Sequence, residues 1–268
     1  MNFSLSLTHD CNLACTYCYA GHTTKRTMSW ETAKKAIEFG LSVSEDKVQL
    51  GFFGGEPLLE WELLVKATEY AEKLCKERNI ELQLTVTTNG TLLTRERVAW
   101  LKEHDFYPGL SIDGMRAMHE ITRPLRGGGS SFDQTVDGLT LLMERYPDLE
   151  VIMVPDPSNI MHMTESVKYL HGELGVKDIS INPNFYTEWG DEALEQWEAS
   201  FEAIGDYYIE RMRANDFFQV NFIDGKIITH IKNGLEACDK CGFAEKEFAV
   251  APSGDMYGCE RLIGNDDN

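Results

Sequence analysis

Apolar, β-rich runs alternate along the chain with longer segments in which apolar residues recur with a helical period. Such alternation is typical of βα units around a parallel sheet. Strands are expected at Phe3 to Leu7, Val48 to Phe53, Gln83 to Thr87, Gly109 to Ile112, Val151 to Val154 and Ile179 to Ile181. Because connections between parallel strands are right-handed, six successive units curl the sheet into a partial (β/α)6 TIM-like barrel, three quarters of the eight-unit form.

Helices are expected between and after these strands, at residues 29–40, 61–78, 94–104, 132–146, 164–175 and 191–214. Ser29 is suited to cap the first of them and Gly40 to end it. The segment from Arg123 to Ser131, which contains three successive glycines, is expected to be a mobile loop. In a barrel of this kind, the chemistry takes place in the loops at the carboxyl ends of the strands.

The C-terminal stretch "EFAVAPSGDMYGC" alternates on both sides of a Pro-Ser-Gly-Asp turn, which predicts a β-hairpin. The chain is therefore expected to be an α/β protein with three parts. These are a barrel over residues 1–190, a helical connecting segment over 191–237 and a small hairpin module over 238–268.

Composition narrows the possible partners. Of the 268 residues, 44 are acidic and 25 are Lys or Arg, a net charge of -19. This balance argues against a nucleic-acid partner, because phosphate binding requires clustered cations. There is no apolar run long enough to cross a membrane and no N-terminal signal peptide, so we expect a cytoplasmic protein with no membrane partner.

The seven cysteines are unevenly placed. An odd number of cysteines without an export signal is not typical of a disulfide framework. Cys75 stands alone in a helical segment and is expected to be a small buried apolar residue. The other six form a front group and a back group: Cys11, Cys15 and Cys18, then Cys238, Cys241 and Cys259.

The front group directly follows the first predicted strand, at the mouth of the barrel. Three thiolates on so short a loop can bind one soft metal centre. Three cysteines leave one iron of a four-iron cluster without a protein ligand. A structural zinc site is the alternative, but it normally takes four ligands, and His22 is the only nearby candidate for the fourth.

The segment "CNLACTYC" resembles the cysteine motif of the radical S-adenosylmethionine (radical SAM) superfamily. The resemblance implies that three cysteines hold a [4Fe-4S] cluster and that S-adenosylmethionine chelates its unique iron. An electron from the cluster then cleaves the cofactor to methionine and a 5′-deoxyadenosyl radical, which abstracts hydrogen from a substrate. It also implies an external electron donor such as flavodoxin or ferredoxin, and places Tyr17 near the adenine.

The segment "FFGGEPLLE" is similar to the Gly-Gly-Glu-Pro segment of that family, which receives the amino group of the methionine moiety. Glycines let a backbone approach a ligand closely, and a carboxylate accepts from an ammonium group. The segments "TVTTNGTLL", "LSIDG" and "ITRPLR" also resemble segments of that family. Together these resemblances give a set of cofactor-binding candidates: Gly54, Gly55, Glu56, Pro57, Asn89, Ser111 and Arg123. Arg126 is an alternative to Arg123. From the residues alone, Asn89 and Asp113 could equally form turns with the glycines that follow them.

The back group resembles the start of a SPASM domain, an auxiliary-cluster module of radical SAM enzymes that modify peptides and proteins. The match includes Cys241, Gly254 and Cys259, but the later cysteine-rich run of that domain is absent. The module is therefore expected to be truncated or reduced, with a zinc site as the alternative to an iron-sulfur cluster. Glu260 is a candidate base by resemblance to sulfatase-maturating members, where an acidic residue follows the matching cysteine. A salt bridge with Arg261 or Lys246 is the competing role.

The sequence thus predicts a radical SAM oxidoreductase that modifies a side chain of a peptide or protein, as a peptide maturase forming a crosslink or thioether. One alternative is an anaerobic sulfatase-maturating enzyme that makes formylglycine. The other is a non-catalytic iron-sulfur or zinc scaffold. No leader-peptide-recognition domain is expected before the first strand.

Overall fold

The computed structural model describes residues 1–19, 25–235 and 247–265. Within them, one nine-stranded sheet has the order β7-β6-β5-β4-β3-β2-β1-β8-β9. The strands are β1 Asn2–Thr8, β2 Lys47–Gly54, β3 Glu81–Thr88, β4 Phe106–Ser111, β5 Glu150–Met153, β6 Asp178–Ile181, β7 Gln219–Val220, β8 Glu247–Val250 and β9 Met256–Tyr257. Neighbouring strands are parallel except for the final pair, β8 and β9. The six expected strands are therefore confirmed, and they follow chain order across the sheet.

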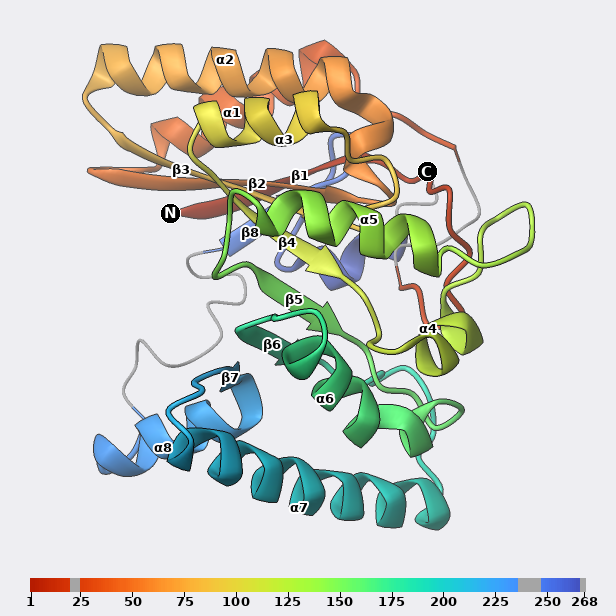
Figure 1. Cartoon of the computed structure of the whole chain (residues 1–268). Coiled ribbons are helices and arrows are strands. Elements are labelled where there is room, and N and C mark those ends of the chain that lie inside the picture. Colours follow the sequence, from red (N-terminus) through yellow and green to blue (C-terminus); the bar gives the residue numbers. More distant parts are fainter. Residues whose placement is uncertain (20–24, 236–246, 266–268) are drawn as a thin grey trace.

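Helices lie along the outer side of this curved sheet (Figure 1). They are α1 Trp30–Ser42, α2 Trp61–Arg78, α3 Arg95–Glu103, α4 Arg116–Thr122, α5 Phe132–Met143, α6 Met163–Gly172, α7 Asp191–Arg213 and α8 Asn221–Ile231. Among the described residues, the short 3-10 helices η1 Pro57–Glu60 and η2 Ile160–His162 lie in connections, and η4 Glu260–Asn265 follows β9. The capping role expected of Ser29 is confirmed, since its side chain accepts from the backbone N–H of Thr32. Gly40 does not end α1, which continues to Ser42.

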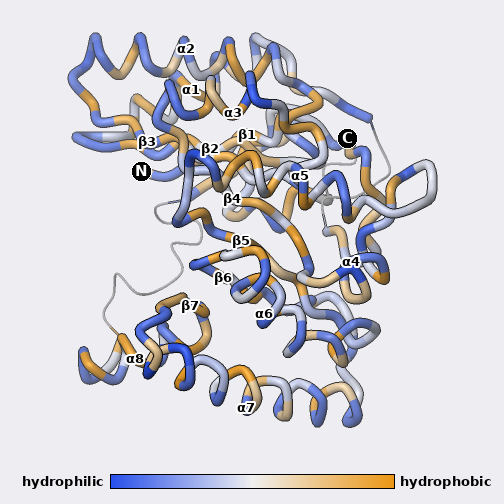
Figure 2. The backbone as a smooth tube through the Cα atoms, viewed as in Figure 1, coloured by the Kyte–Doolittle hydropathy of each residue, from blue (hydrophilic) through white to orange (hydrophobic). Residues whose placement is uncertain are grey.

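The core results from alternation along the strands. In β1, Phe3, Leu5 and Leu7 are almost fully buried, and the ring of Phe3 packs against Gly40 of α1. Ser4 and Ser6 point to the other face of the sheet, because successive side chains of a strand alternate. Figure 2 shows β4 and β5 as largely apolar. In β1, apolar side chains thus pack against the outer helices, and the two serines face the inside of the barrel.

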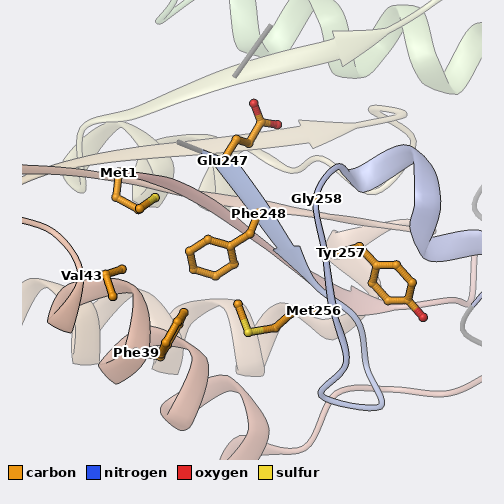
Figure 3. Close-up of a pocket in the computed structure, with 8 residues that line it drawn as sticks. All are labelled: Met1, Phe39, Val43, Glu247, Phe248, Met256, Tyr257 and Gly258. Carbon is orange, nitrogen blue, oxygen red and sulfur yellow. The ribbon is translucent and has the colours of Figure 1, made fainter. Parts of the chain in front are cut away.

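The C-terminal hairpin is confirmed, and β8 pairs in parallel with β1. The Phe248 ring stacks on Phe3 with 5.3 Å between centroids and meets the edge of Phe39 at 5.6 Å. Figure 3 shows Phe248 and Phe39 beside Val43 and Met256, around an apolar cavity of about 330 Å³ between α1 and the hairpin. Because β8 extends the barrel sheet, the segment that follows the hairpin returns to the barrel mouth.

The structure contains elements that the sequence pattern did not predict. Helix α4 precedes the Gly-rich segment, and β7 and α8 follow α7. No residue of α8 is fully buried. No helix among the described residues is long and apolar enough to span a membrane.

Candidate functional site

A cavity of about 420 Å³ opens at the carboxyl ends of the strands. Its wall combines the cysteine loop, the turn after β2, the ends of β3 to β6 and the segment after the C-terminal hairpin. Most of the predicted site residues line it: Cys11, Cys15, Tyr17, Cys18, Gly54, Gly55, Glu56, Asn89, Ser111, Arg123, Cys259 and Glu260. Pro57 starts η1 behind the cavity. Cys238 and Cys241, together with the alternative zinc ligand His22, lie outside the described residues.

The three front cysteines provide thiol donors on one wall of the cavity. Burial raises the pKa of Cys11 to about 11 and that of Cys15 to about 12, and the neighbouring cysteines add to both shifts. Among the described residues, no three His, Cys, Asp or Glu side chains converge closely enough to hold one metal ion. In a four-iron cluster each thiolate binds a different iron, so its ligands stand further apart than those of a single zinc ion. The donor set fits such a cluster.

Hydrogen bonds from the backbone and from Asn89 point at the first of these thiols. Cys11 Sγ accepts from the backbone N–H of Leu13 at 3.4 Å and from Asn89 Nδ2 at 3.8 Å. Asn89 Nδ2 also donates to Asn12 Oδ1, Asn12 Nδ2 donates to Thr91 Oγ1, and Thr91 Oγ1 donates to Asn89 Oδ1. This closed ring fixes the amide of Asn89 beside a predicted cluster ligand. The turn that the residues alone suggested is present too, since Asn89 Oδ1 accepts from the backbone N–H of Thr91.

The cysteine loop is held by the segment after α4. The backbone N–H of Ala14 donates to Pro124 O at 2.8 Å, and that of Thr16 donates to Thr122 O at 2.9 Å. Asp10 Oδ1 accepts from the backbone N–H of Cys11 at 3.0 Å and pairs with Arg126. Arg126 therefore contacts the base of the cysteine loop, whereas Arg123 lines the cavity.

The Gly-Gly-Glu-Pro segment packs so closely against the cysteine loop that only glycine fits at its first two positions. A Cβ on Gly54 would lie 2.5 Å from Thr8 O, and one on Gly55 would lie 2.1 Å from Asp10 O. The backbone N–H groups of Gly55 and Glu56 donate to those carbonyls at 2.7 and 2.9 Å. In this structure the close approach expected of the glycines is made to the backbone of the cysteine loop.

Glu56 is almost fully buried at 1% exposure. Its Oε1 accepts from Thr88 Oγ1 at 2.7 Å and from the backbone N–H of Leu58 at 3.1 Å, while Oε2 accepts from the backbone N–H of Asn89 at 2.8 Å. Burial raises the pKa of Glu56, which these hydrogen bonds oppose. A carboxylate has about four acceptor positions, so capacity for an ammonium group remains on Oε2.

Tyr17 and Arg123 form the opposite wall. The guanidinium carbon of Arg123 lies 5.4 Å from the centre of the Tyr17 ring, and Tyr17 OH donates to Asp113 Oδ2 at 2.7 Å. Burial raises the pKa of Tyr17, so this hydroxyl is a donor at neutral pH. Sequence reasoning missed the role of Asp113 and weighed it only as a turn residue.

The segment after the hairpin brings Cys259 and Glu260 to the same cavity. The Glu260 carboxylate accepts from the hydroxyl of Ser4, and burial raises the pKa of Glu260. The guanidinium of Arg261 lies over the ring of Phe185 at 5.7 Å. Lys246, the other salt-bridge candidate, is outside the described residues.

Aromatic rings line the cavity next to this carboxylate. Tyr19 stacks at 6.3 Å on Phe53 and also at 6.3 Å on Tyr186, whose hydroxyl donates to Arg261 O at 3.2 Å. Sequence reasoning did not single out these rings. They belong to three separate segments, and only the fold brings them together.

The model of the radical SAM superfamily matches residues 5–170, more than half of the chain. The chain belongs to this superfamily. Membership implies a [4Fe-4S] cluster and S-adenosylmethionine as cofactors, and the superfamily is one of enzymes. The cysteine loop, the Gly-Gly-Glu-Pro turn and α4 all fall inside the matched region.

Curated relatives include an uncharacterised protein of Methanocaldococcus jannaschii, 34% identical over 66% of this chain and 60% of its own length. A cysteine-type anaerobic sulfatase-maturating enzyme of Clostridium perfringens is 23% identical over 94% of this chain and 72% of its own length. The chain thus spans less than two thirds of the length of the Methanocaldococcus jannaschii protein.

Solved structures share the fold. Native anSMEcpe with bound AdoMet superimposes with a TM-score of 0.84 at 21% identity, covering 98% of this chain and 75% of that chain. Streptococcus suis SuiB bound to its precursor peptide SuiA gives a TM-score of 0.68 at 14% identity, covering 100% of this chain and 61% of that chain. The partial barrel expected from the sequence is therefore confirmed.

Proposed function

We propose that this radical SAM enzyme modifies a side chain of a peptide or protein and acts as a maturase that forms a crosslink or thioether. The observation that carries the proposal is the composition of one cavity, which joins the three front cysteines to Cys259 and Glu260 of the C-terminal segment. A substrate placed between them would meet the cofactor on one side and a carboxylate on the other.

Relatives and structural neighbours support a peptide substrate. They include the sulfatase-maturating enzyme of Clostridium perfringens and a radical SAM cyclopropyl synthase, TigE, of Paramaledivibacter caminithermalis. The anSMEcpe structure is also known with a bound peptide, and SuiB with its precursor peptide. These are properties of those proteins, and for this chain they support a proposal.

The proposed cofactor site uses the residues of the cavity wall. Cys11, Cys15 and Cys18 would hold the cluster, which would supply the electron for cleavage of S-adenosylmethionine to methionine and a 5′-deoxyadenosyl radical. Glu56 would accept from the amino group of the methionine moiety and Arg123 would pair with its carboxylate. Tyr17, by its place on the wall, would contact the adenine. Ser111 lines the cavity and would contact the ribose or the carboxylate.

Glu260 is proposed to take a proton from the substrate. Its pKa is raised by burial, which makes the carboxylate a stronger proton acceptor than an exposed glutamate. Crosslinking removes two hydrogens from the substrate: one leaves as a hydrogen atom to the radical, and the other as a proton plus an electron. An auxiliary cluster held by Cys259 with Cys238 and Cys241 would supply the acceptor for that electron, and an external acceptor would reoxidise it.

The test is mass spectrometry of candidate peptides incubated anaerobically with reconstituted enzyme, S-adenosylmethionine and a reductant. A loss of two hydrogens with no free aldehyde is expected for a crosslink or thioether. A product that reacts with a hydrazide probe would instead indicate formylglycine. Unchanged peptides across the set, with 5′-deoxyadenosine still formed, would contradict the proposal. A non-catalytic scaffold would form no 5′-deoxyadenosine.

Glu260→Gln separates the proposed base from the rest of the site. The variant should form 5′-deoxyadenosine but modify the peptide at least about tenfold more slowly, because the amide cannot accept the proton. Glu195→Gln, an exposed glutamate of α7, is the matched control and should behave as wild type. Equal peptide modification by both variants would exclude Glu260 as the base.

A further inference from the structure

Asp113 lies directly after β4 and is fully buried at 0% exposure. A buried carboxylate is costly unless donors surround it, and here they do. Asp113 Oδ2 accepts from Tyr17 OH and from Thr122 Oγ1, both at 2.7 Å, and Oδ1 accepts from the backbone N–H of Val154 at 3.0 Å. Arg123 Nε lies 3.1 Å from Oδ1.

These contacts come from three different loops at the barrel mouth. Tyr17 belongs to the cysteine loop, Thr122 and Arg123 end α4, and Val154 follows β5. The Tyr17 hydroxyl donates a hydrogen bond to the carboxylate, whereas Arg123 contacts it as an ion pair whose Nε–H is not aligned for a hydrogen bond. Asp113 itself does not line the cavity, whereas Tyr17 and Arg123 do.

We propose that Asp113 is a positioning residue that sets Tyr17 and Arg123 in place for S-adenosylmethionine before the cofactor binds. Fixing the ring of Tyr17 and one side of the Arg123 guanidinium leaves the outer nitrogens of the arginine free to form paired hydrogen bonds with a carboxylate. A site that is already ordered loses less conformational entropy on binding. Because the inference concerns only cofactor binding, it holds whichever peptide the enzyme modifies.

The experiment compares Asp113→Asn with the wild-type holoenzyme, reconstituted anaerobically to equal iron content. The substitution keeps the shape of the side chain but removes the charge and one acceptor oxygen. We expect S-adenosylmethionine to bind about tenfold more weakly, as for loss of a charged hydrogen-bond acceptor. The KM for the cofactor should rise while the maximal rate of 5′-deoxyadenosine formation changes much less. Asp133→Asn, an exposed aspartate paired with Arg116, is the control.

A double-mutant cycle distinguishes positioning from general loss of structure. Tyr17→Phe removes only the hydroxyl that donates a hydrogen bond to Asp113. It should therefore weaken cofactor binding when introduced into the wild type, and cause little further loss of affinity when introduced into Asp113→Asn. The change that S-adenosylmethionine causes in the electron paramagnetic resonance spectrum of the reduced cluster gives an independent measure of binding.

A milder variant keeps the test decisive if Asp113→Asn does not fold. Thr122→Val removes one donor to the same oxygen, and Thr122 does not line the cavity. A roughly threefold weaker affinity with unchanged iron content is expected. Wild-type affinity in both variants, or affinity losses that only follow lost iron, would overturn the proposal.

Discussion

A single methyl group is the smallest change that the cofactor site should not tolerate. The carbonyl of Asp10 lies 2.1 Å from the position that a Cβ on Gly55 would take, and backbone cannot yield as the end of a side chain can. Gly127, in the loop after α4, has no atom within 4 Å of the same position. The two glycines therefore offer a matched comparison.

Gly55→Ala should lower the free energy of unfolding by about 1 to 3 kcal/mol, the usual cost of overpacking. Because the loop that must move carries Cys11, the variant should also take up less iron on reconstitution. Urea unfolding and iron analysis measure the two effects, with Gly127→Ala expected to match the wild type. Equal stability and iron content in both variants would contradict this explanation.

Individual site residues could be predicted from the sequence where their neighbours in the chain carry the signal. The cysteine loop and the Gly-Gly-Glu-Pro segment are contiguous motifs, and the structure brings both to one cavity. Asp113 could not be found this way, because its partner Tyr17 is 96 residues distant in the chain. The ring of Asn12, Asn89 and Thr91 escaped prediction for the same reason.

At the scale of elements, α4 connects the strand end to the cofactor site through a buried histidine. His119 Nδ1 accepts from the backbone N–H of Asp113 at 3.4 Å, and Nε2 donates to Ser131 Oγ at 2.9 Å. Ser131 Oγ in turn donates to Arg123 O at 2.6 Å. This chain of hydrogen bonds requires a neutral imidazole, so this link between α4 and the turn exists only while His119 is unprotonated.

Acid should therefore weaken the fold through His119. Burial lowers the pKa of His119 from 6.5 to about 4, so the unfolded chain binds more protons between these values. Its contribution, about 3 kcal/mol, is fully present above pH 6.5 and is lost as the pH falls towards 4.

Urea unfolding of the wild type and of His119→Gln at a series of pH values measures the contribution of His119 to the free energy of unfolding. The free energy of unfolding should fall less steeply below pH 6.5 in the variant. His230→Gln, at an exposed histidine of α8, controls for the loss of an imidazole. Parallel pH curves for wild type and His119→Gln would refute the assignment.

The principal elements could be predicted because strands and helices with a buried face have a clear period. Strand β7, with two residues, is too short to show alternation. Helix α8 has apolar residues but no fully buried one, so its pattern carries no core-facing stripe. The pairing of β8 with β1 depends on contacts between the two ends of the chain, and no local pattern reports it.

For the molecule as a whole, the net charge of -19 should govern the approach of small reductants. An acidic field repels anions and attracts cations, and salt screens both effects. Between about 20 and about 300 mM salt, cluster reduction by the dithionite anion should become faster by a few-fold, whereas reduction by the methyl viologen radical cation should become slower.

Stopped-flow absorbance of the reconstituted enzyme measures both rates, and each reductant serves as the control for the other. A salt dependence of the same sign for both would show that the overall charge does not govern access to the cluster.

The hydrogen bonds between the cysteine loop and residues 122–126 make metal loading and cofactor binding parts of one equilibrium. With the role proposed for Arg123, a cluster that orders the loop would also order the segment carrying this arginine and raise the affinity for S-adenosylmethionine. By thermodynamic reciprocity, the bound cofactor must strengthen retention of the cluster by the same factor. Bound S-adenosylmethionine is therefore expected to reduce loss of the cluster. In a cell poor in S-adenosylmethionine, a larger fraction of this enzyme would lack its cluster.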